Sequence, residues 1–97
     1  METYIIKSPS LGTLDILMRR KGTPGKDLPE YGVDAVGLVQ GGLIEMVVAS
    51  DIAEKASGVT VEDIKGSCPQ NMIMLAIFGD TASVENAINE IKAAMQK

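Results

Sequence analysis

The stretch "MLAIFGDTASVENAINEIKAAM" (74–95) decides the fold of this chain. It begins with a continuous apolar run, which is typical of a buried strand. "GD" (79–80) then turns the chain, and Asp80 can accept hydrogen bonds from the first turn of a helix. In that helix, apolar residues at spacings of three and four form one stripe: Val84, Ala87, Ile88, Ile91 and Met95. A buried strand followed by an amphipathic helix predicts a helix that covers one face of a sheet.

Similar elements precede this stretch. "VDAVGLV" (33–39) predicts a central strand, and 59–65 and 72–78 predict two more. Residues 42–57 predict a helix that ends at Gly58, with an Asp51–Lys55 ion pair on its solvent side. The apolar residues that recur at helical spacing in it are Leu43, Ile44, Val47, Val48, Ile52 and Ala56.

Two β-prone segments, 3–7 and 13–18, begin the chain and are predicted as strands that can pair in a hairpin. A long loop follows them over 19–32, where glycine and proline are frequent. We interpret residues 1–97 as one domain of the α/β (α+β) class. The predicted architecture is a ferredoxin-like β-β-α-β-β-α sandwich, in which two helices cover one sheet.

The composition excludes several classes of function. The 97 residues include no histidine, so catalysis and zinc sites built on imidazole are excluded. Glu62 and Asp63 are neighbours on a strand and point to opposite faces, so they do not form a catalytic pair. The net charge of −4 argues against nucleic acid, and the longest apolar run is too short to cross a membrane. A single cysteine suits a reducing compartment, and we expect a soluble cytoplasmic protein that is not an enzyme.

Several segments, in a fixed order, carry a family resemblance. They are "AVGLV" (35–39), "QGGL" (40–43), "EKASGV" (54–59), "IKGSCPQ" (64–70), "MLAIFGD" (74–80) and "VENAINEIKAA" (84–94). Residues 34–95 thereby resemble the shell domain of bacterial microcompartments (BMC). Ordinary members end with a strand after the second helix, which this chain lacks, and it carries strand-like segments in front instead. It therefore resembles the circularly permuted form of the domain, with "TLDILM" (13–18) in place of the missing strand.

The resemblance implies a structural role. Members of the family form cyclic homohexamers that tile, with other shell proteins, into a shell around enzymes, and small metabolites cross at the sixfold axis. The loop that surrounds the axis corresponds here to Lys65, Gly66, Ser67, Cys68, Pro69 and Gln70. Lys55 matches a lysine at the hexamer edge, where Arg19 or Arg20 is also expected.

Cys68 gains a role from this placement. Cyclic symmetry would gather six thiols around one axis, and cysteine thiolates hold iron–sulfur clusters, commonly four at a time. The loop "GSCPQ" is similar to that of glycyl-radical-type shell proteins, some of which are associated with such a cluster. We expect a metal site at Cys68, with an iron–sulfur cluster of the 4Fe–4S kind shared between subunits. The alternatives are a turn thiol that only narrows the pore, or a plain solute pore lined by the same loop.

One other function fits the element count, and a third can be weighed against the single cysteine. A ferredoxin-like domain of this size can be a small-molecule sensing module, with ligand held between subunits. A stand-alone electron carrier is disfavoured, because one cysteine per chain leaves a cluster short of ligands.

Overall fold

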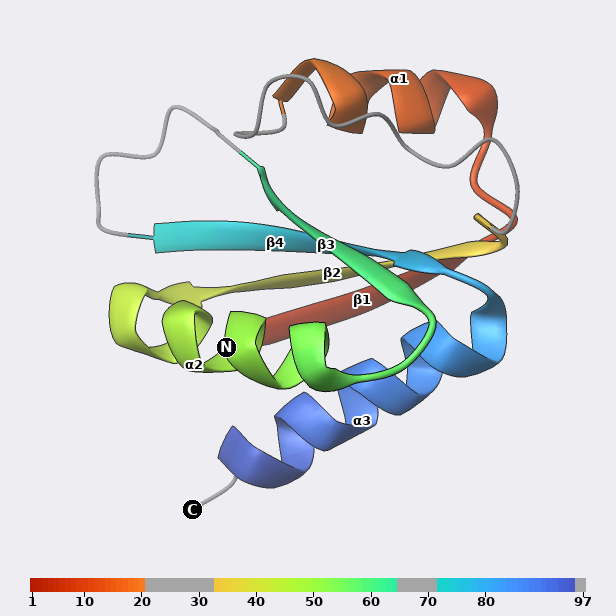
Figure 1. The fold of residues 1–97 in the computed structure, drawn as a ribbon. Helices are drawn as coiled ribbons and strands as arrows, with labels where there is room; N and C mark the ends of the chain where they lie inside the picture. Colours follow the sequence, from red (N-terminus) through yellow and green to blue (C-terminus); the bar gives the residue numbers. More distant parts are fainter. Residues whose placement is uncertain (21–32, 65–71, 96–97) are drawn as a thin grey trace.

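The computed structural model of the chain describes residues 1–20, 33–64 and 72–95. Its elements follow in the order β1 (Glu2–Lys7), α1 (Leu11–Arg20), β2 (Ala35–Gly42), α2 (Leu43–Lys55), β3 (Val59–Ile64), β4 (Met72–Gly79) and α3 (Thr81–Met95). These strands form one antiparallel sheet in the order β1-β2-β4-β3. Figure 1 shows α1 on one face of the sheet and both α2 and α3 on the other. The predicted α+β class and the two helices on a single sheet are confirmed.

The strand predicted at 13–18 is wrong, because these residues lie within α1. Ser10 caps the helix: the backbone N–H of Thr13 donates to the Ser10 Oγ at 3.2 Å. Leu14 and Leu17, three residues apart, face the sheet, and Leu17 is buried there. The segment has both alternating and helical apolar spacing, and the cap and packing favour the helix.

The sheet gains its additional strand from β1 instead. This strand pairs with β2 along its whole length, from Glu2 opposite Gln40 to Lys7 opposite Ala35. The predicted hairpin between 3–7 and 13–18 is therefore replaced by an edge strand and a helix that crosses the sheet.

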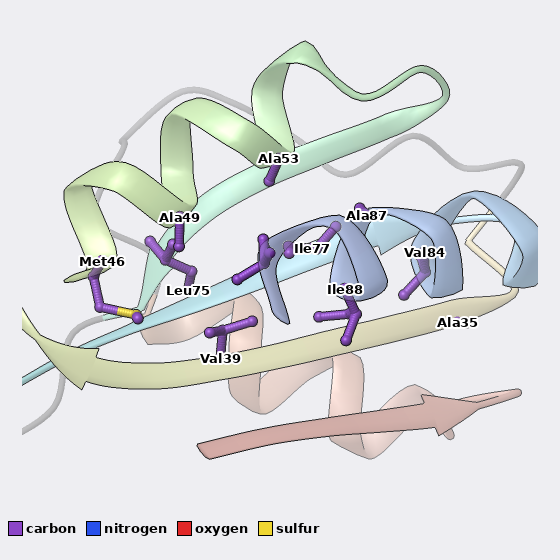
Figure 2. Packing of buried hydrophobic residues seen from close by; sticks show 11 residues of the cluster. Ala35, Val39, Met46, Ala49, Ala53, Leu75, Ile77, Val84, Ala87 and Ile88 are labelled. Atoms are coloured by element: carbon purple, nitrogen blue, oxygen red, sulfur yellow. The ribbon is translucent and has the colours of Figure 1, made fainter. Parts of the chain in front are cut away.

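The larger core lies between the sheet and α2 with α3. Figure 2 shows its side chains pointing into the space between these layers. The cluster consists of Ala35, Val39, Met46, Ala49, Ala53, Leu75, Ile77, Val84, Ala87, Ile88 and Ile91. The stripe predicted on α3 is confirmed, since four of its members are buried and Met95 is partly buried against them.

A second cluster lies on the other face of the sheet, under α1. It contains Leu17, Val36, Ile64, Ala76 and Phe78. Because both faces of β2 and β4 are covered, these strands carry apolar residues at nearly every position, as the continuous runs predict.

Candidate functional site

The predicted pore segment lies outside the described residues, but the strands on both sides of it are described. Lys65, Gly66, Ser67, Cys68, Pro69 and Gln70 all belong to 65–71, which the structure does not describe. Ile64 ends β3 opposite Met74, and Met72 begins β4 opposite Gly42. The chain therefore enters and leaves this segment at one end of the sheet, where β2 ends and α2 begins.

Lys55 lies at the other end of the subunit. It is the last residue of α2, a helix of 13 residues that starts at the end of the sheet flanking 65–71. At about 1.5 Å per residue the helix spans about 20 Å. The Lys55 Nζ contacts the Asp51 Oδ2 at 2.8 Å, which confirms the predicted ion pair, and both side chains are exposed. The flanks of the predicted pore segment and the predicted edge lysine thus lie toward opposite ends of the subunit.

Arg19 and Arg20 end α1 with exposed side chains. The Arg19 Nη2 lies 3.3 Å from the Asp15 Oδ2, four residues earlier. In Figure 1, α1 runs toward the end of the sheet at which β4 begins. The two arginines end α1 on the face of the sheet opposite to α2, so the structure does not bring them to Lys55.

Two turns, each held by a side-chain hydrogen bond, set where α2 and α3 begin. The backbone N–H of Gly42 donates to the Glu45 Oε1 at 3.1 Å, which fixes the sharp passage from β2 into α2. The backbone N–H of Ser83 donates to the Asp80 Oδ2 at 3.1 Å, so the predicted cap of α3 is confirmed. Hydrogen bonds from the Ser83 side chain and backbone hold the pKa of Asp80 below its usual value.

The outward face of α2 is unusually apolar. Of the six residues that predict this helix, only Ile52 and Ala56 pack against the core, and its fully buried residues are Met46, Ala49 and Ala53. The other four are exposed, with exposed fractions of 53% for Leu43, 81% for Ile44, 61% for Val47 and 44% for Val48. We call these four residues the α2 ridge.

A hollow lies on the opposite face of the sheet, beyond the part that α1 covers. Its volume is about 150 Å³, and its walls come from three neighbouring strands. It is lined by Glu2, Thr3, Tyr4, Leu38, Gln40 and Met74. We call it the sheet hollow. It lies at the same end of the sheet as the flanks of 65–71, since Met74 and Gln40 are paired two residues from that end.

Glu62 carries a buried carboxyl group that the sequence-based predictions missed. The residue is 3% exposed, and neither carboxylate oxygen has a hydrogen-bond partner among the described residues. Asp63 is exposed, so the expectation that the two carboxylates point to opposite faces is confirmed. The alternation of β3 could have predicted the burial, because Glu62 shares its face with the buried Ile64.

Within 1–20, 33–64 and 72–95, no three His, Cys, Asp or Glu side chains gather where they could hold a metal ion. This part of the chain also contains no helix that is both long and apolar enough to span a membrane.

Comparison with known proteins decides the family. The BMC domain model matches residues 35–97. The chain belongs to the BMC domain family. The solved ligand-free structure of the GrpU microcompartment shell protein from Clostridiales bacterium 1_7_47FAA is 55% identical, with a TM-score of 0.77, and the match covers 100% of this chain and 94% of that one. The ligand-free GrpU shell protein from Pectobacterium wasabiae is 32% identical, with a TM-score of 0.71, and the match covers 94% of this chain and 99% of that one. No curated protein sequence matches the chain.

The family gives this BMC protein a structural role in the shell of a microcompartment, where it assembles with other shell proteins. The predicted family, role and location are thereby confirmed. The shell role takes the place of the sensing module, and it is structural and not catalytic.

Proposed function

We propose that six copies of this BMC protein form a ring in which residues 65–70 surround the axis. The observation that carries this proposal is the opposite placement of two features. The flanks of 65–71 lie at one end of the subunit, and Lys55 lies at the other. A subunit with its loop at the axis would present Lys55 at the rim, where neighbouring rings meet.

The proposal includes a circular permutation within a single domain, residues 1–97. The family model begins at residue 35, and β1, which precedes it, holds the sheet edge beside β2. Met1 and Met95 line one common pocket, so the start of β1 lies near the end of α3. Termini that lie close together make permutation physically inexpensive. In this proposal β1 supplies the strand that ordinary members carry after their last helix.

Cys68 is the residue that would give the axis its chemistry. One subunit cannot hold a cluster by itself, because the chain has a single cysteine and no histidine. A sixfold ring presents six thiols, enough for the cysteine ligands of an iron–sulfur cluster. When bound, such a cluster would supply one-electron chemistry at the axis. In its absence the same loop would line a pore for small metabolites, with Gly66 and Ser67 offering backbone and hydroxyl groups.

The lateral contacts of the ring are assigned to Lys55. Its exposed ammonium, at the end of α2, can reach a neighbouring ring or another shell protein. Arg19 and Arg20 remain candidates for the same edge in the sequence-based prediction. Their place on α1, on the face of the sheet opposite to α2, would set them apart from Lys55 on that edge.

The test is purification without oxygen, followed by an absorption spectrum and measurement of iron and sulfide. Wild-type protein is expected to be brown and to contain both elements. Cys68→Ser is expected to be colourless but to keep the mass of the ring. The matched control is Ser67→Ala, which leaves every thiol in place and should keep the colour. Colourless wild-type protein would overturn the cluster, and the pore would then be a plain solute channel.

A further inference from the structure

The α2 ridge is a surface that a lone subunit does not explain. A stretch of helix that is apolar on both sides, as α2 is from Leu43 to Val48, is normally buried on both sides. One side of α2 packs on the sheet through Met46, Ala49 and Ala53. The ridge itself contains no charged residue: Glu45 turns back to the Gly42 backbone, and Asp51, four residues after Val47, is paired with Lys55. Isolated apolar residues on a surface are ordinary, but four adjacent ones form a contact patch.

The sheet hollow is the counterpart of the ridge in shape and polarity. Tyr4 is 75% exposed at its margin, while Leu38 and Met74 are half-buried in it. Most of the exposed area inside is apolar, and Glu2 is the only acidic or basic residue among those that line it. Because the ridge is neutral, packing it into such a hollow would not desolvate any charged group of the ridge.

The dimensions of the two surfaces agree. At about 1.5 Å per residue, the ridge from Leu43 to Val48 is about 8 Å long. Strands lie about 4.8 Å apart, so the three strands that line the hollow span about 10 Å. Both surfaces lie toward the end of the sheet that flanks 65–71, but on opposite faces of it.

We propose that the α2 ridge of one copy packs into the sheet hollow of the next copy. This inference rests on the ring proposed above and names the surfaces that close it. Two different patches on opposite sides of one subunit generate a head-to-tail contact, and such contacts form rings when the rotation closes. Because both patches lie near the flanks of 65–71, this packing brings those segments from all copies toward one axis.

The area of the ridge argues against a simple dimer through α2. The ridge exposes on the order of a few hundred Å² of apolar surface, whereas a stable pair needs about 800 Å² from each partner. A symmetric α2–α2 pair would use the ridge twice and leave the hollow empty. Head-to-tail packing covers both surfaces on every subunit, and each subunit is then held by two neighbours.

The test uses one new cysteine on each surface, in a Cys68→Ser background, with a short bis-maleimide as cross-linker. Val47→Cys marks the ridge and Tyr4→Cys marks the hollow, and both native side chains are largely exposed, so the variants should fold. Each variant alone is expected to stay uncross-linked. Coexpression of the two should give cross-linked dimers, and the double variant should give a ladder up to the full ring.

Each other outcome has a defined meaning. Cross-linked dimers from Val47→Cys alone would show a symmetric α2 contact and overturn the inference. A ring of full mass without cross-links in the mixture would overturn the inference and leave the ring intact. A background protein that runs as a monomer or dimer would overturn the ring and, with it, the inference.

A charge placed on the ridge gives an independent readout. Ile44→Lys is expected to shift the ring to single subunits in native mass spectrometry. Ile16→Lys is the matched control, because Ile16 is a 51% exposed apolar residue on α1, outside both surfaces. Intact rings from Ile44→Lys would contradict the proposed packing.

Discussion

The two helices on the same face of the sheet divide their apolar residues in opposite ways. In α3 the large apolar side chains, such as Ile88 and Ile91, face the core. In α2 small alanines fill most of the core positions, and the larger Leu43, Ile44 and Val47 face outward. The difference fits the proposed packing, in which α3 contributes its apolar side chains to the fold of the subunit and α2 contributes to both the fold and a contact with another copy.

The largest expected loss of stability comes from a substitution on the buried side of α3. Ile88→Ala removes a side chain that is 1% exposed, and should lower the free energy of unfolding by about 2–5 kcal/mol. Urea denaturation at several protein concentrations should show this loss at each of them. Ile44→Ala is the counterpart on α2, and its effect should appear only where copies assemble, because it acts through association. A concentration-independent loss in both variants would contradict the division between the helices.

The close approach of α3 to the sheet can be tested at Gly37. A Cβ at this position would lie 3.0 Å from Ile88 carbons and 3.1 Å from a Val84 carbon. Gly37→Ala should therefore crowd α3 and lower the free energy of unfolding by about 1–3 kcal/mol. Thermal unfolding followed by circular dichroism measures the change. An unchanged Tm would mean that α3 moves away from the sheet at little cost.

Glu62 tests the α1 side of the sheet, where its buried carboxyl group has no hydrogen-bond partner among the described residues. Glu62→Leu should raise the free energy of unfolding by about 1–3 kcal/mol, because burial of a polar group without hydrogen bonds is costly. The matched variant Asp63→Leu changes an exposed neighbour and should have little effect on subunit stability. A loss of stability in Glu62→Leu would reveal a donor that the carboxylate needs.

The cap of α3 should give a small effect that depends on pH. Because the folded chain lowers the pKa of Asp80 below 3.8, the ionised carboxylate stabilises the fold. This contribution is complete at neutral pH and is lost as the pH falls from 3.8 through the lower folded pKa. Asp80→Ala should therefore lower the Tm at pH 7, and the difference from wild type should shrink below pH 3.8. A constant difference across this range would assign the effect to lost packing.

The smallest effect on subunit stability is expected at the rim. Lys55 has an exposed side chain in a surface ion pair, a kind of contact that contributes little to stability. Lys55→Ala should leave unfolding and ring mass unchanged and impair the lateral packing of rings. Electron microscopy of assembled sheets checks this, and Lys92→Ala, on the exposed face of α3, is the control. Sheets that form unchanged in Lys55→Ala would contradict the assignment of Lys55 to contacts between rings.

The sequence predicts the fold best where one period dominates. The continuous runs of β2 and β4 and the single stripe of α3 left no competing interpretation, and each element lies where it was expected. Residues 13–18 were misread because Leu14 and Leu17 fit a helix while the short segment also alternates. The buried face of α2 could not be recognised from the sequence because two of its three buried residues are alanines, which contribute little to a hydrophobic pattern. Their small side chains allow the helix to pack closely on the sheet.

The site could be predicted only in part. The Asp51–Lys55 pair and the Asp80 cap follow from local spacing and are confirmed. The pairing of surfaces between copies depends on which residues the fold leaves exposed, and no local pattern encodes that. The role of Cys68 stays a prediction, since it depends on symmetry and lies outside the described residues.

Native mass spectrometry of the unmodified chain tests the central claim most directly. The claim is that identical subunits close into a ring around the segment that contains Cys68. A dominant species of six times the 10.3 kDa subunit is the predicted result. A monomer or dimer at concentrations where shells assemble would contradict it.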